Sequence, residues 1–375
     1  MNRTIGILGG GQLGRMLTFA AKRLGYRVVT LDPAADCPCG QVADAQIVAA
    51  YDDEAALDEL AKQSDVLTYE FENIPLDSVT SLEEAGYSLA PNGHVLRITQ
   101  DRVLEKQFVN GCGIATAPFA PVTSFAELEA ALLTVGLPAV LKTCRGGYDG
   151  KGQWRIASIR DAREAFVAAQ GAPLILEGFV PFDKEISVVA ARDALGTVVT
   201  FPVTENIHEA GILAMSIAPA RVSDAVAAAA RALAVRIAEG LEIIGAFAVE
   251  CFVLGDEVLV NEIAPRVHNS GHYSIEACTI SQYEMHIRAI SGLPLVQPRL
   301  LAPAVMVNIL GSGTGDQLDG VFPLLSDPDI ALHLYGKPHA ALRRKMGHFT
   351  VVAPTLEAAL EKAEHGRSYL RWVTL

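Results

Sequence analysis

This chain of 375 residues lacks a long apolar run, and its first residues lack the apolar core and cleavage pattern of a signal peptide. A membrane span needs roughly 18 to 20 apolar residues in succession, and no segment comes near that length. We therefore expect a cytoplasmic protein with no membrane partner.

Paired cysteines and an excess of positive charge are also missing. The six cysteines form no CxxC pair, so we expect Cys37 and Cys39 to be free loop thiols rather than metal ligands, in a reducing compartment. The net charge of −13 disfavours nucleic acid as a partner. An anionic ligand would therefore need a local cluster of cations.

The length and the hydrophobic content of 50% predict two or three domains with substantial cores. The first hundred residues alternate between strand and helix patterns, which predicts an α/β fold with a parallel, doubly wound sheet. Strands are expected at residues 5–8, 28–31, 46–48 and 66–69, with helices after the first, third and fourth.

The remaining two thirds of the chain have a mixed α+β pattern. After residue 298 short strands and one helix are expected to pack on the rest of the molecule. The expected helices lie near 100–109 and at 125–133, 223–239 and 356–364, and the expected strands at 139–142, 153–156, 174–177 and 185–190.

Two acidic residues lie in apolar strand patterns on either side of a turn at Gly255-Asp256. A carboxylate in such a strand usually needs a compensating cation. Antiparallel pairing would bring Glu250 and Glu262 together, and paired carboxylates suit Mg²⁺ bound to phosphate. The alternative is a pair of edge-strand acids facing solvent.

The first glycine-rich turn, Gly9–Gly14, has the form G-x-G-x-x-G, and Asp32 follows the next strand. This pattern by itself is typical of dinucleotide-binding enzymes, although many α/β domains bind other phosphates there. It therefore leaves an oxidoreductase open as an alternative.

A second glycine-rich segment follows Lys142 and runs through Gly146–Gln153. Its glycines and its lysines predict a flexible, cationic flap over a polyphosphate, although a solvated hairpin is the alternative. It does not match G-x-x-x-x-G-K-[ST], so it is no Walker A loop.

Two further segments contain residues suited to a nucleotide or a phosphate. Glu177–Val180 followed by Glu185 could hold an adenine edge and a ribose, or could be an ordinary turn. Lys337 and the cluster Arg343–Lys345 could bind a phosphorylated substrate, or could be solvated turns.

Together these segments resemble the ATP-grasp superfamily and, within it, the N5-carboxyaminoimidazole ribonucleotide synthetase family. Val267 stands where that family usually has proline, and residues 341–343 also depart from its pattern. The matching segments are, in chain order, 9–16, 68–73, 100–102 with Lys106, 146–153, 261–272 and 344–348.

The resemblance implies an N-terminal Rossmann-like domain (1–98), a central α+β ATP-grasp domain (99–296) with a mobile lid (about 116–182), and a small β-rich C-terminal domain (297–375). It also implies a homodimer. The implied reaction joins bicarbonate to 5-aminoimidazole ribonucleotide through carboxyphosphate, with ATP becoming ADP and phosphate, in purine biosynthesis. Mg²⁺ would be required, with Mn²⁺ as a possible substitute.

The family's functional residues can be placed on this sequence one by one. Glu70 or Glu72, with the first glycine turn, would help to position the aminoimidazole, and His208 could instead be a core histidine. The metal would be held by Glu250 and Glu262. ATP contacts would be Arg102, Lys142, Gly147, Tyr148, Asp149, Gly150, Lys151, Gly152, Gln153, Glu177, Gly178, Phe179, Val180, Glu185, His208, Asn261 and Glu262. The ribonucleotide and bicarbonate would meet Tyr148, Asp149, Lys151, Arg266, His268, Asn269, Lys337 and Arg344.

Three other functions stay open on the sequence. A Rossmann oxidoreductase explains the first glycine turn and leaves the Glu250–Glu262 pair without a purpose. A non-catalytic nucleotide sensor would not need Asp149, Arg266 or His268. A formate-using transformylase or a biotin carboxylase would share the fold, and only residues 268–272 and 344–348 argue against it.

Overall fold

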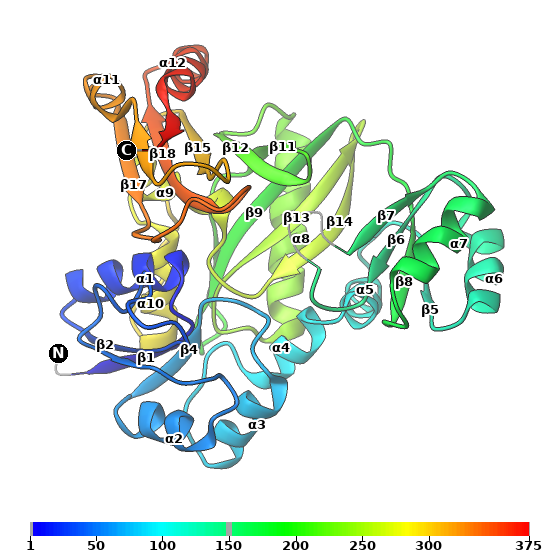
Figure 1. Ribbon diagram of the computed structural model, residues 1–375, viewed down its shortest axis with the longest axis horizontal. Helices are drawn as coiled ribbons and strands as arrows, with labels where there is room; N and C mark the ends of the chain where they lie inside the picture. Colours follow the sequence, from blue (N-terminus) through cyan, green and yellow to red (C-terminus); the bar gives the residue numbers. More distant parts are fainter. Residues whose placement is uncertain (1–2, 148–151, 375) are drawn as a thin grey trace.

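The structure is a computed structural model that describes residues 3–147 and 152–374. Its described part contains four sheets, and the largest of them runs through the middle of the molecule (Figure 1). No helix in these two ranges is long and apolar enough to cross a membrane.

The N-terminal region is a four-stranded sheet with helices around it. Its sheet has the order β3-β2-β1-β4, and every pairing in it is parallel, as the sequence predicts. Asp101 caps α5 by accepting hydrogen bonds from the first-turn N–H groups of Val103 and Leu104. The elements of this region are β1 (Thr4–Leu8), α1 (Gln12–Arg23), β2 (Arg27–Leu31), β3 (Ala45–Ile47), α2 (Glu54–Lys62), β4 (Val66–Tyr69), α3 (Leu76–Glu84), α4 (Gly93–Thr99) and α5 (Arg102–Gly111).

A small lobe, residues 119–178, projects to one side of the molecule (Figure 1). Two helices cover its antiparallel sheet, whose order is β5-β8-β6-β7, and the lobe has an apolar core of its own. Its elements are β5 (Phe119–Val122), α6 (Phe125–Val135), β6 (Ala139–Thr143), β7 (Gln153–Ile156), α7 (Ile159–Ala168) and β8 (Leu174–Gly178).

The central region supplies most of the large sheet. Helix α8 packs on one face of it, and the C-terminal part of the chain extends the same sheet. The central elements are β9 (Lys184–Arg192), β10 (Val198–Thr200), β11 (Thr204–Glu209), β12 (Ile212–Ala218), α8 (Asp224–Leu241), β13 (Gly245–Leu254), β14 (Glu257–Ala264), the 3₁₀ turn η1 (Asn269–Gly271), α9 (Ser274–Ala277) and α10 (Gln282–Ser291).

The C-terminal segment completes this sheet. Strand β15 pairs with β12, so the order is β14-β13-β9-β11-β12-β15-β18-β17, with β10 beside β9 and a separate β16-β19 pair. The expectation that this segment packs on the rest is confirmed. Its elements are β15 (Ala304–Leu310), β16 (Gln317–Asp319), α11 (Val321–Leu325), β17 (Ile330–Leu334), β18 (Lys345–Val352), α12 (Leu356–Tyr369) and β19 (Arg371–Val373).

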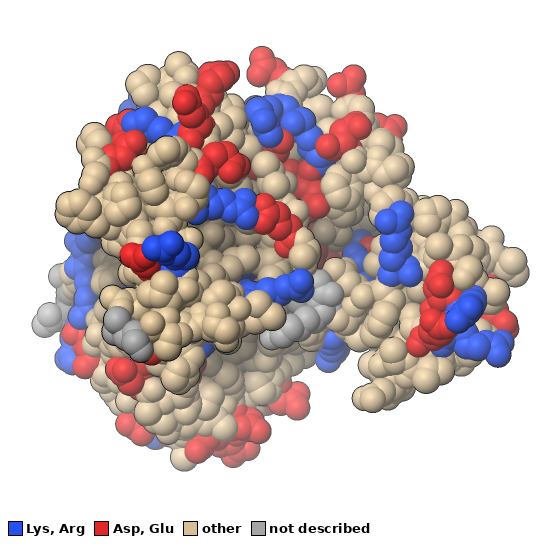
Figure 2. Space-filling view, turned by 45° about the horizontal axis from the view of Figure 1, so that its top comes forward, with Lys and Arg blue, Asp and Glu red and all other residues tan. Residues whose placement is uncertain are grey.

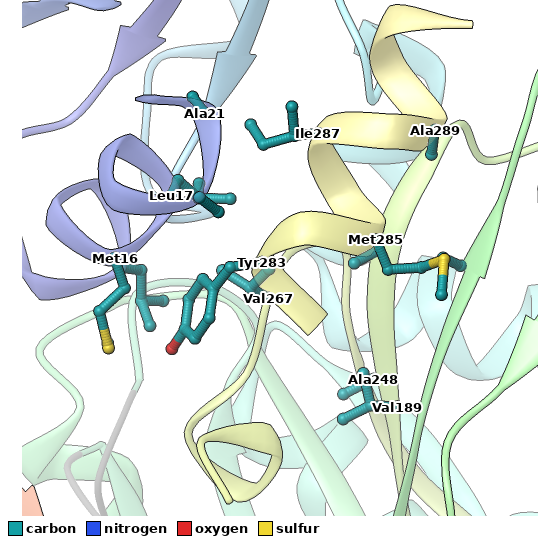
Figure 3. Packing of buried hydrophobic residues seen from close by; sticks show 14 of the residues in the cluster. Met16, Leu17, Ala21, Val189, Ala248, Val267, Tyr283, Met285, Ile287 and Ala289 are labelled. Atoms are coloured by element: carbon teal, nitrogen blue, oxygen red, sulfur yellow. The ribbon is translucent and has the colours of Figure 1, made fainter. Parts of the chain in front are cut away.

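Helix α10 joins the N-terminal region to the large sheet. Figure 3 shows Tyr283 and Ile287 of α10 facing Leu17 of α1, while Met285 points toward the sheet. Val267, the departure from the family pattern, is fully buried in the same cluster. The loop that contains Arg266, His268 and Asn269 is therefore held in place by Val267, which packs in a buried apolar core.

Candidate active site

A cavity of about 530 Å³ opens where the lobe meets the large sheet. Figure 2 shows the lobe projecting from the body, with a hollow between them and basic side chains on its rim. Apart from Lys337, Arg344 and the candidate Glu70, every described residue of the predicted site lines it. These lining residues are Arg102, Lys142, Gly147, Gly152, Gln153, Glu177, Gly178, Phe179, Val180, Glu185, His208, Glu250, Asn261, Glu262, Arg266, His268 and Asn269.

Four residues of the predicted site, Tyr148, Asp149, Gly150 and Lys151, lie outside the described residues. Their flanks form the β6–β7 hairpin, in which the Thr143 N–H donates to the Gly152 carbonyl at 2.9 Å. Gly152 has a φ of +66°, and a Cβ there would lie 2.8 Å from Thr143 Oγ1, so this end of the loop requires glycine.

A second, smaller cavity of about 210 Å³ adjoins the first. Four residues line both cavities and so form the border between them: Arg266, His268, Asn269 and Lys345. The rest of the smaller cavity comes from the first glycine turn and the end of β4, through Gln12, Leu13, Glu70 and Phe71. The site therefore has two compartments that meet at a polar border.

The predicted hairpin of the two acids is confirmed. Glu250 on β13 and Glu262 on β14 are direct antiparallel partners, and the next pair toward the turn is Cys251 with Val260. Asn261 is thus an extra residue, a β-bulge, which aims its side chain to the same cavity as Glu262. Because both acids line the cavity, the solvent-facing alternative is wrong.

Both carboxylates of the hairpin have cationic or N–H partners. Arg102 Nη1 lies 2.9 Å from Glu262 Oε2, and His268 Nε2 lies 3.0 Å from Glu250 Oε1. Burial raises the pKa of Glu262, but Arg102 outweighs burial and lowers it to about 2. Glu262 therefore stays ionised at any physiological pH.

Glu105 is an acidic residue of this cavity that the sequence interpretation missed. Its Oε1 accepts a hydrogen bond of 2.7 Å from the N–H of Ile263. Burial, with the nearby charge of Glu262, raises the pKa of Glu105 to about 8. On α5 it sits within an ordinary amphipathic pattern, so no local signal set it apart.

Two lysines surround the carboxylate of Glu177. Lys142 Nζ lies 2.9 Å and Lys106 Nζ 3.4 Å from its Oε2, and these cations outweigh burial, so the pKa of Glu177 is lowered. Lys106 also donates to the carbonyl of Asn261 at 3.2 Å. The motif residue Lys106 thus connects the lobe to the bulge on β14.

His208 lines the nucleotide-sized cavity and is not a core histidine. Its Nδ1 lies 2.9 Å from Glu185 Oε2, in an ion-pair contact without hydrogen-bond alignment. Burial lowers the pKa of His208, but Glu185 outweighs burial and the net shift is upward.

The first glycine turn is filled by the chain's own carboxylates. Glu70 accepts hydrogen bonds from the N–H groups of Gly11 and, at 2.6 Å, of Gly14. Asp32 accepts from the N–H of Gly10 at 2.7 Å and from the Tyr51 hydroxyl at 2.6 Å. These are the donors that a pyrophosphate would use in a dinucleotide site. The N–H groups of the turn therefore bind the carboxylates of Asp32 and Glu70, which argues against the oxidoreductase alternative.

The two acids after β4 have different surroundings. Glu72 forms a two-oxygen ion pair with Arg266, with Oε1 2.9 Å from Arg266 Nη2, and borders the larger cavity. Glu70 borders the smaller cavity, and its pKa is raised by burial despite its N–H donors. Glu70 is therefore the one of the two that faces the smaller compartment.

The two predicted phosphate cations on the C-terminal segment do not line either cavity. Lys337 Nζ donates to the carbonyl of Lys345 at 2.7 Å, and the exposed Arg344 donates to the carbonyl of His339 at 3.3 Å. Lys345, which begins β18, lines both cavities, whereas the sequence prediction included it only as a member of a cationic cluster and assigned the contact to Arg344. Its place in the cluster Arg343–Lys345 was the available signal.

Two amide side chains that the sequence interpretation missed hold the border loop in place. Gln282, fully buried at the start of α10, accepts from the His268 N–H at 2.9 Å and donates to the His268 carbonyl at 2.7 Å. Asn308 of β15 exchanges two hydrogen bonds with the Asn269 amide, at 3.0 and 2.6 Å. Neither amide stands near a recognisable motif, so only the folded chain identifies them.

Comparison with known families covers most of the chain. The family model described as the ribonucleotide synthetase preATP-grasp domain matches residues 1–100, and the ATP-grasp domain model matches residues 107–283. A third, the phosphoribosylaminoimidazole carboxylase C-terminal domain, matches residues 304–362.

Individual relatives agree with these domains. The N5-carboxyaminoimidazole ribonucleotide synthase of Brucella melitensis is 50% identical over 94% of this chain and 96% of its own length. A crystal structure of the ADP complex of an N5-carboxyaminoimidazole ribonucleotide synthetase is 46% identical, covers 98% of this chain and 96% of that one, and has a TM-score of 0.93.

A third relative is the enzyme from Aspergillus clavatus in complex with ADP and 5-aminoimidazole ribonucleotide. It is 34% identical, covers 98% of both chains and has a TM-score of 0.92. With the fold, the two-compartment site and these relatives in agreement, the chain belongs to the N5-carboxyaminoimidazole ribonucleotide synthase family of ADP-forming ATP-grasp ligases.

Proposed function

We propose that this chain carboxylates the exocyclic amine of 5-aminoimidazole ribonucleotide with bicarbonate, converting ATP to ADP and phosphate. The product would be N5-carboxyaminoimidazole ribonucleotide, in purine biosynthesis. One observation carries the proposal: a cavity large enough for a nucleotide adjoins a smaller one, and Arg266, His268, Asn269 and Lys345 border both. A phosphoryl group in one compartment can therefore react with a group held in the other.

The larger cavity suits ATP because its charged side chains match the parts of that ligand. Arg102 and Lys142 supply fixed positive charge for phosphates, while Phe179 and Val180 offer an apolar surface to a purine. The loop residues Tyr148, Asp149 and Lys151 are proposed to close over the phosphates, since carboxyphosphate decomposes in water.

The residues at the bulge fit a Mg²⁺ or Mn²⁺ ion. Glu250 and Glu262 are paired oxygen donors, and Asn261 Oδ1 is a buried oxygen without a hydrogen-bond partner in the described structure. Hard divalent cations bind such carboxylate and amide oxygens. When bound, the ion would neutralise phosphate charge as bicarbonate attacks.

The chemistry follows at the border of the compartments. A bicarbonate oxygen attacks the γ-phosphorus, ADP leaves, and the amine of the ribonucleotide then displaces phosphate from the carboxyl carbon. Arg266, kept in place by Glu72, and Lys345 would offset the negative charge of bicarbonate and of carboxyphosphate. Glu70 faces the compartment proposed for the aminoimidazole.

Three further expectations belong to this proposal. Lys337 and Arg344 would meet the 5′-phosphate of the ribonucleotide, next to Lys345. The domain boundaries at 98/99 and 296/297, with the lid at about 116–182, are the proposed division of the chain. The active protein would be a cytoplasmic homodimer.

The decisive experiment is an ADP-release assay on the purified chain with Mg-ATP. ADP release should require both bicarbonate and 5-aminoimidazole ribonucleotide, and the carboxylated product should appear in equal amount. ADP release driven by formate and glycinamide ribonucleotide instead would contradict the proposal in favour of a transformylase.

A further inference from the structure

A row of buried polar side chains lies behind the border loop, inside the large sheet. Thr204, Ser187 and Glu250 are direct cross-strand partners on β11, β9 and β13, so their side chains share one face of the sheet. Thr204 and Ser187 are almost fully buried, at 1% and 0% exposure. The row continues through Glu250 to its partner Glu262 on β14, and His268 contacts the Glu250 carboxylate.

The hydroxyl and amide groups of this region form a directed chain of hydrogen bonds. Ser216 Oγ donates to Asn206 Oδ1 at 2.9 Å, and Asn206 Nδ2 donates to Ser187 Oγ at 2.9 Å. Ser187 Oγ donates to Ser270 Oγ at 2.7 Å. Ser270 Oγ then lies 2.9 Å from Nδ1 of His268. Ser270 Oγ accepts from Ser187, which leaves its own hydrogen available for donation to the imidazole.

A second donor converges on the same ring nitrogen. The backbone N–H of Ser270 donates to His268 Nδ1 at 3.3 Å, which also caps the short turn η1. An amide N–H can only donate, so a proton on Nδ1 would face it directly. Both donors favour the ring proton on Nε2, which lies 3.0 Å from Glu250 Oε1, and the amide contact at 3.3 Å is the weaker of the two.

We propose that Ser270 and Ser187 are positioning residues that hold His268 as the neutral Nε2–H tautomer, with this N–H donated to Glu250. The inference rests on the proposed function, because it gives His268 its role in that site. In this arrangement His268 orients the Glu250 carboxylate for its ligand and does not act as a base through Nε2. Outer partners of this kind commonly fix the tautomer and the ring orientation of an active-site histidine.

The tautomer can be read directly by ¹⁵N NMR on the full-length, ligand-free chain at alkaline pH. His268 signals are assigned by comparison with His268→Asn. We expect Nδ1 in the range of an unprotonated ring nitrogen and Nε2 in the range of a protonated one. A proton found on Nδ1 in the wild-type chain would overturn the proposal.

The test variant is Ser270→Ala, which removes the hydroxyl donor and keeps the backbone N–H. We expect a mixture of tautomers and a kcat lower by about ten- to a hundredfold, with the KM for ATP nearly unchanged. If this variant does not fold, Ser187→Ala removes the donor behind Ser270 and is expected to shift the tautomer in the same direction.

Ser216→Ala is the matched control, because Ser216 is equally buried but lies at the far end of the chain. It should lower stability and leave both the tautomer and kcat unchanged. Two outcomes would show that the network is purely structural and would overturn the proposal. One is an equal loss of kcat in the Ser216 and Ser270 variants. The other is an unchanged tautomer in the Ser270 and Ser187 variants. The NMR measurement does not depend on substrates. The tautomer proposal can therefore be wrong while the proposed carboxylase activity is confirmed, and the activity can be absent while the tautomer is as proposed.

Discussion

The two sides of the site are joined to the large sheet by different kinds of contact. On the side of the first glycine turn, α1 and α10 share one apolar cluster with β9 and β13 (Figure 3). On the side of the lobe, the apolar core is confined to the lobe itself. Its described links to α5 include the Arg145–Asp101 ion pair, the Arg102–Gly147 hydrogen bond and the Lys106–Glu177 ion pair.

The two kinds of contact predict a rigid position for the side of the first glycine turn and an adjustable position for the side of the lobe. Burying apolar surface over a whole helix stabilises a fixed position, because every lost contact leaves a cavity. The Lys106–Glu177 pair is buried, but the Arg145–Asp101 pair is partly exposed, and a pair of that kind contributes little and can exchange partners with water or a ligand. We infer that the compartment beside Glu70 is preformed, whereas the compartment under the lobe can adjust as a nucleotide binds.

The largest expected effect is on the nucleotide side, at Glu262. Glu262→Gln should lower kcat/KM by on the order of a thousandfold, because a metal on the phosphates supplies several kcal/mol of charge stabilisation. The variant should stay folded, with a lower unfolding midpoint because the ion pair with Arg102 is lost. Steady-state ADP release at ordinary Mg²⁺ measures this, with Glu257→Gln, an exposed acid on the same hairpin, as the control. Near-normal turnover by Glu262→Gln would refute the metal assignment.

The next effect is on the apolar side, at Leu17. Leu17 of α1 is fully buried in the apolar cluster that α1 shares with α10. Leu17→Ala should therefore lower the unfolding free energy by about 2 to 5 kcal/mol. Urea unfolding followed by circular dichroism measures the loss. Leu133→Ala, at 89% exposure on lobe helix α6, should stay within about 0.5 kcal/mol of the wild type. A small effect at Leu17 would remove the proposed contrast between the two sides.

A pH-dependent effect is expected at His286, which links the two sheets. Its Nδ1 accepts from the Ala246 N–H at 3.0 Å and its Nε2 lies 2.9 Å from Thr68 Oγ1. Burial lowers the pKa of His286 to about 4, below the unfolded value of about 6.5. Between these values the unfolded chain binds more protons, so stability is retained above pH ~6.5 and is lost as the pH falls toward ~4.

The size of this loss is up to about 3 kcal/mol for His286 alone. Unfolding free energies measured from pH 7 to pH 4 should therefore fall less steeply in His286→Asn, which keeps an acceptor for Ala246. Parallel curves for the variant and the wild type would show that another group controls the acid response.

The smallest expected effect is at the root of the lobe. Arg145→Ala removes a largely exposed ion pair, so the unfolding free energy should change by less than about 1 kcal/mol. The KM for ATP should rise by roughly two- to fivefold, the same range of free energy. Arg160→Ala breaks an exposed pair elsewhere on the lobe and should leave this KM unchanged. A large loss of stability would mean that the lobe root is as rigid as the α1–α10 contact.

The sequence predicted the local parts of this molecule well. The parallel N-terminal strands and the Glu250–Glu262 hairpin follow from short-range alternation and from a turn at Gly255. The pairing of β12 with β15 could not be predicted in this way, because these strands lie far apart in the sequence and either could have paired elsewhere.

The site shows the same limit. Motif residues such as Arg266 and His268 stand in a recognisable segment, and the structure places them at the border of both cavities. Gln282 and Asn308 hold that segment through single amide side chains from other elements. The first glycine turn resembles a dinucleotide site because its backbone is the same, and only the folded chain shows Asp32 and Glu70 filling it.

The bulge at Asn261 determines which residues of the hairpin can be lost. Without Asn261, Val260 and Glu262 would still face Cys251 and Glu250, now as consecutive pairs of a regular ladder. Loss of Leu259 instead would shift the pairing of the neighbouring residues and turn alternate side chains to the opposite face. Loss of Asn261 is therefore compatible with the register of the sheet, and the strand would lose with it a side chain that lines the cavity.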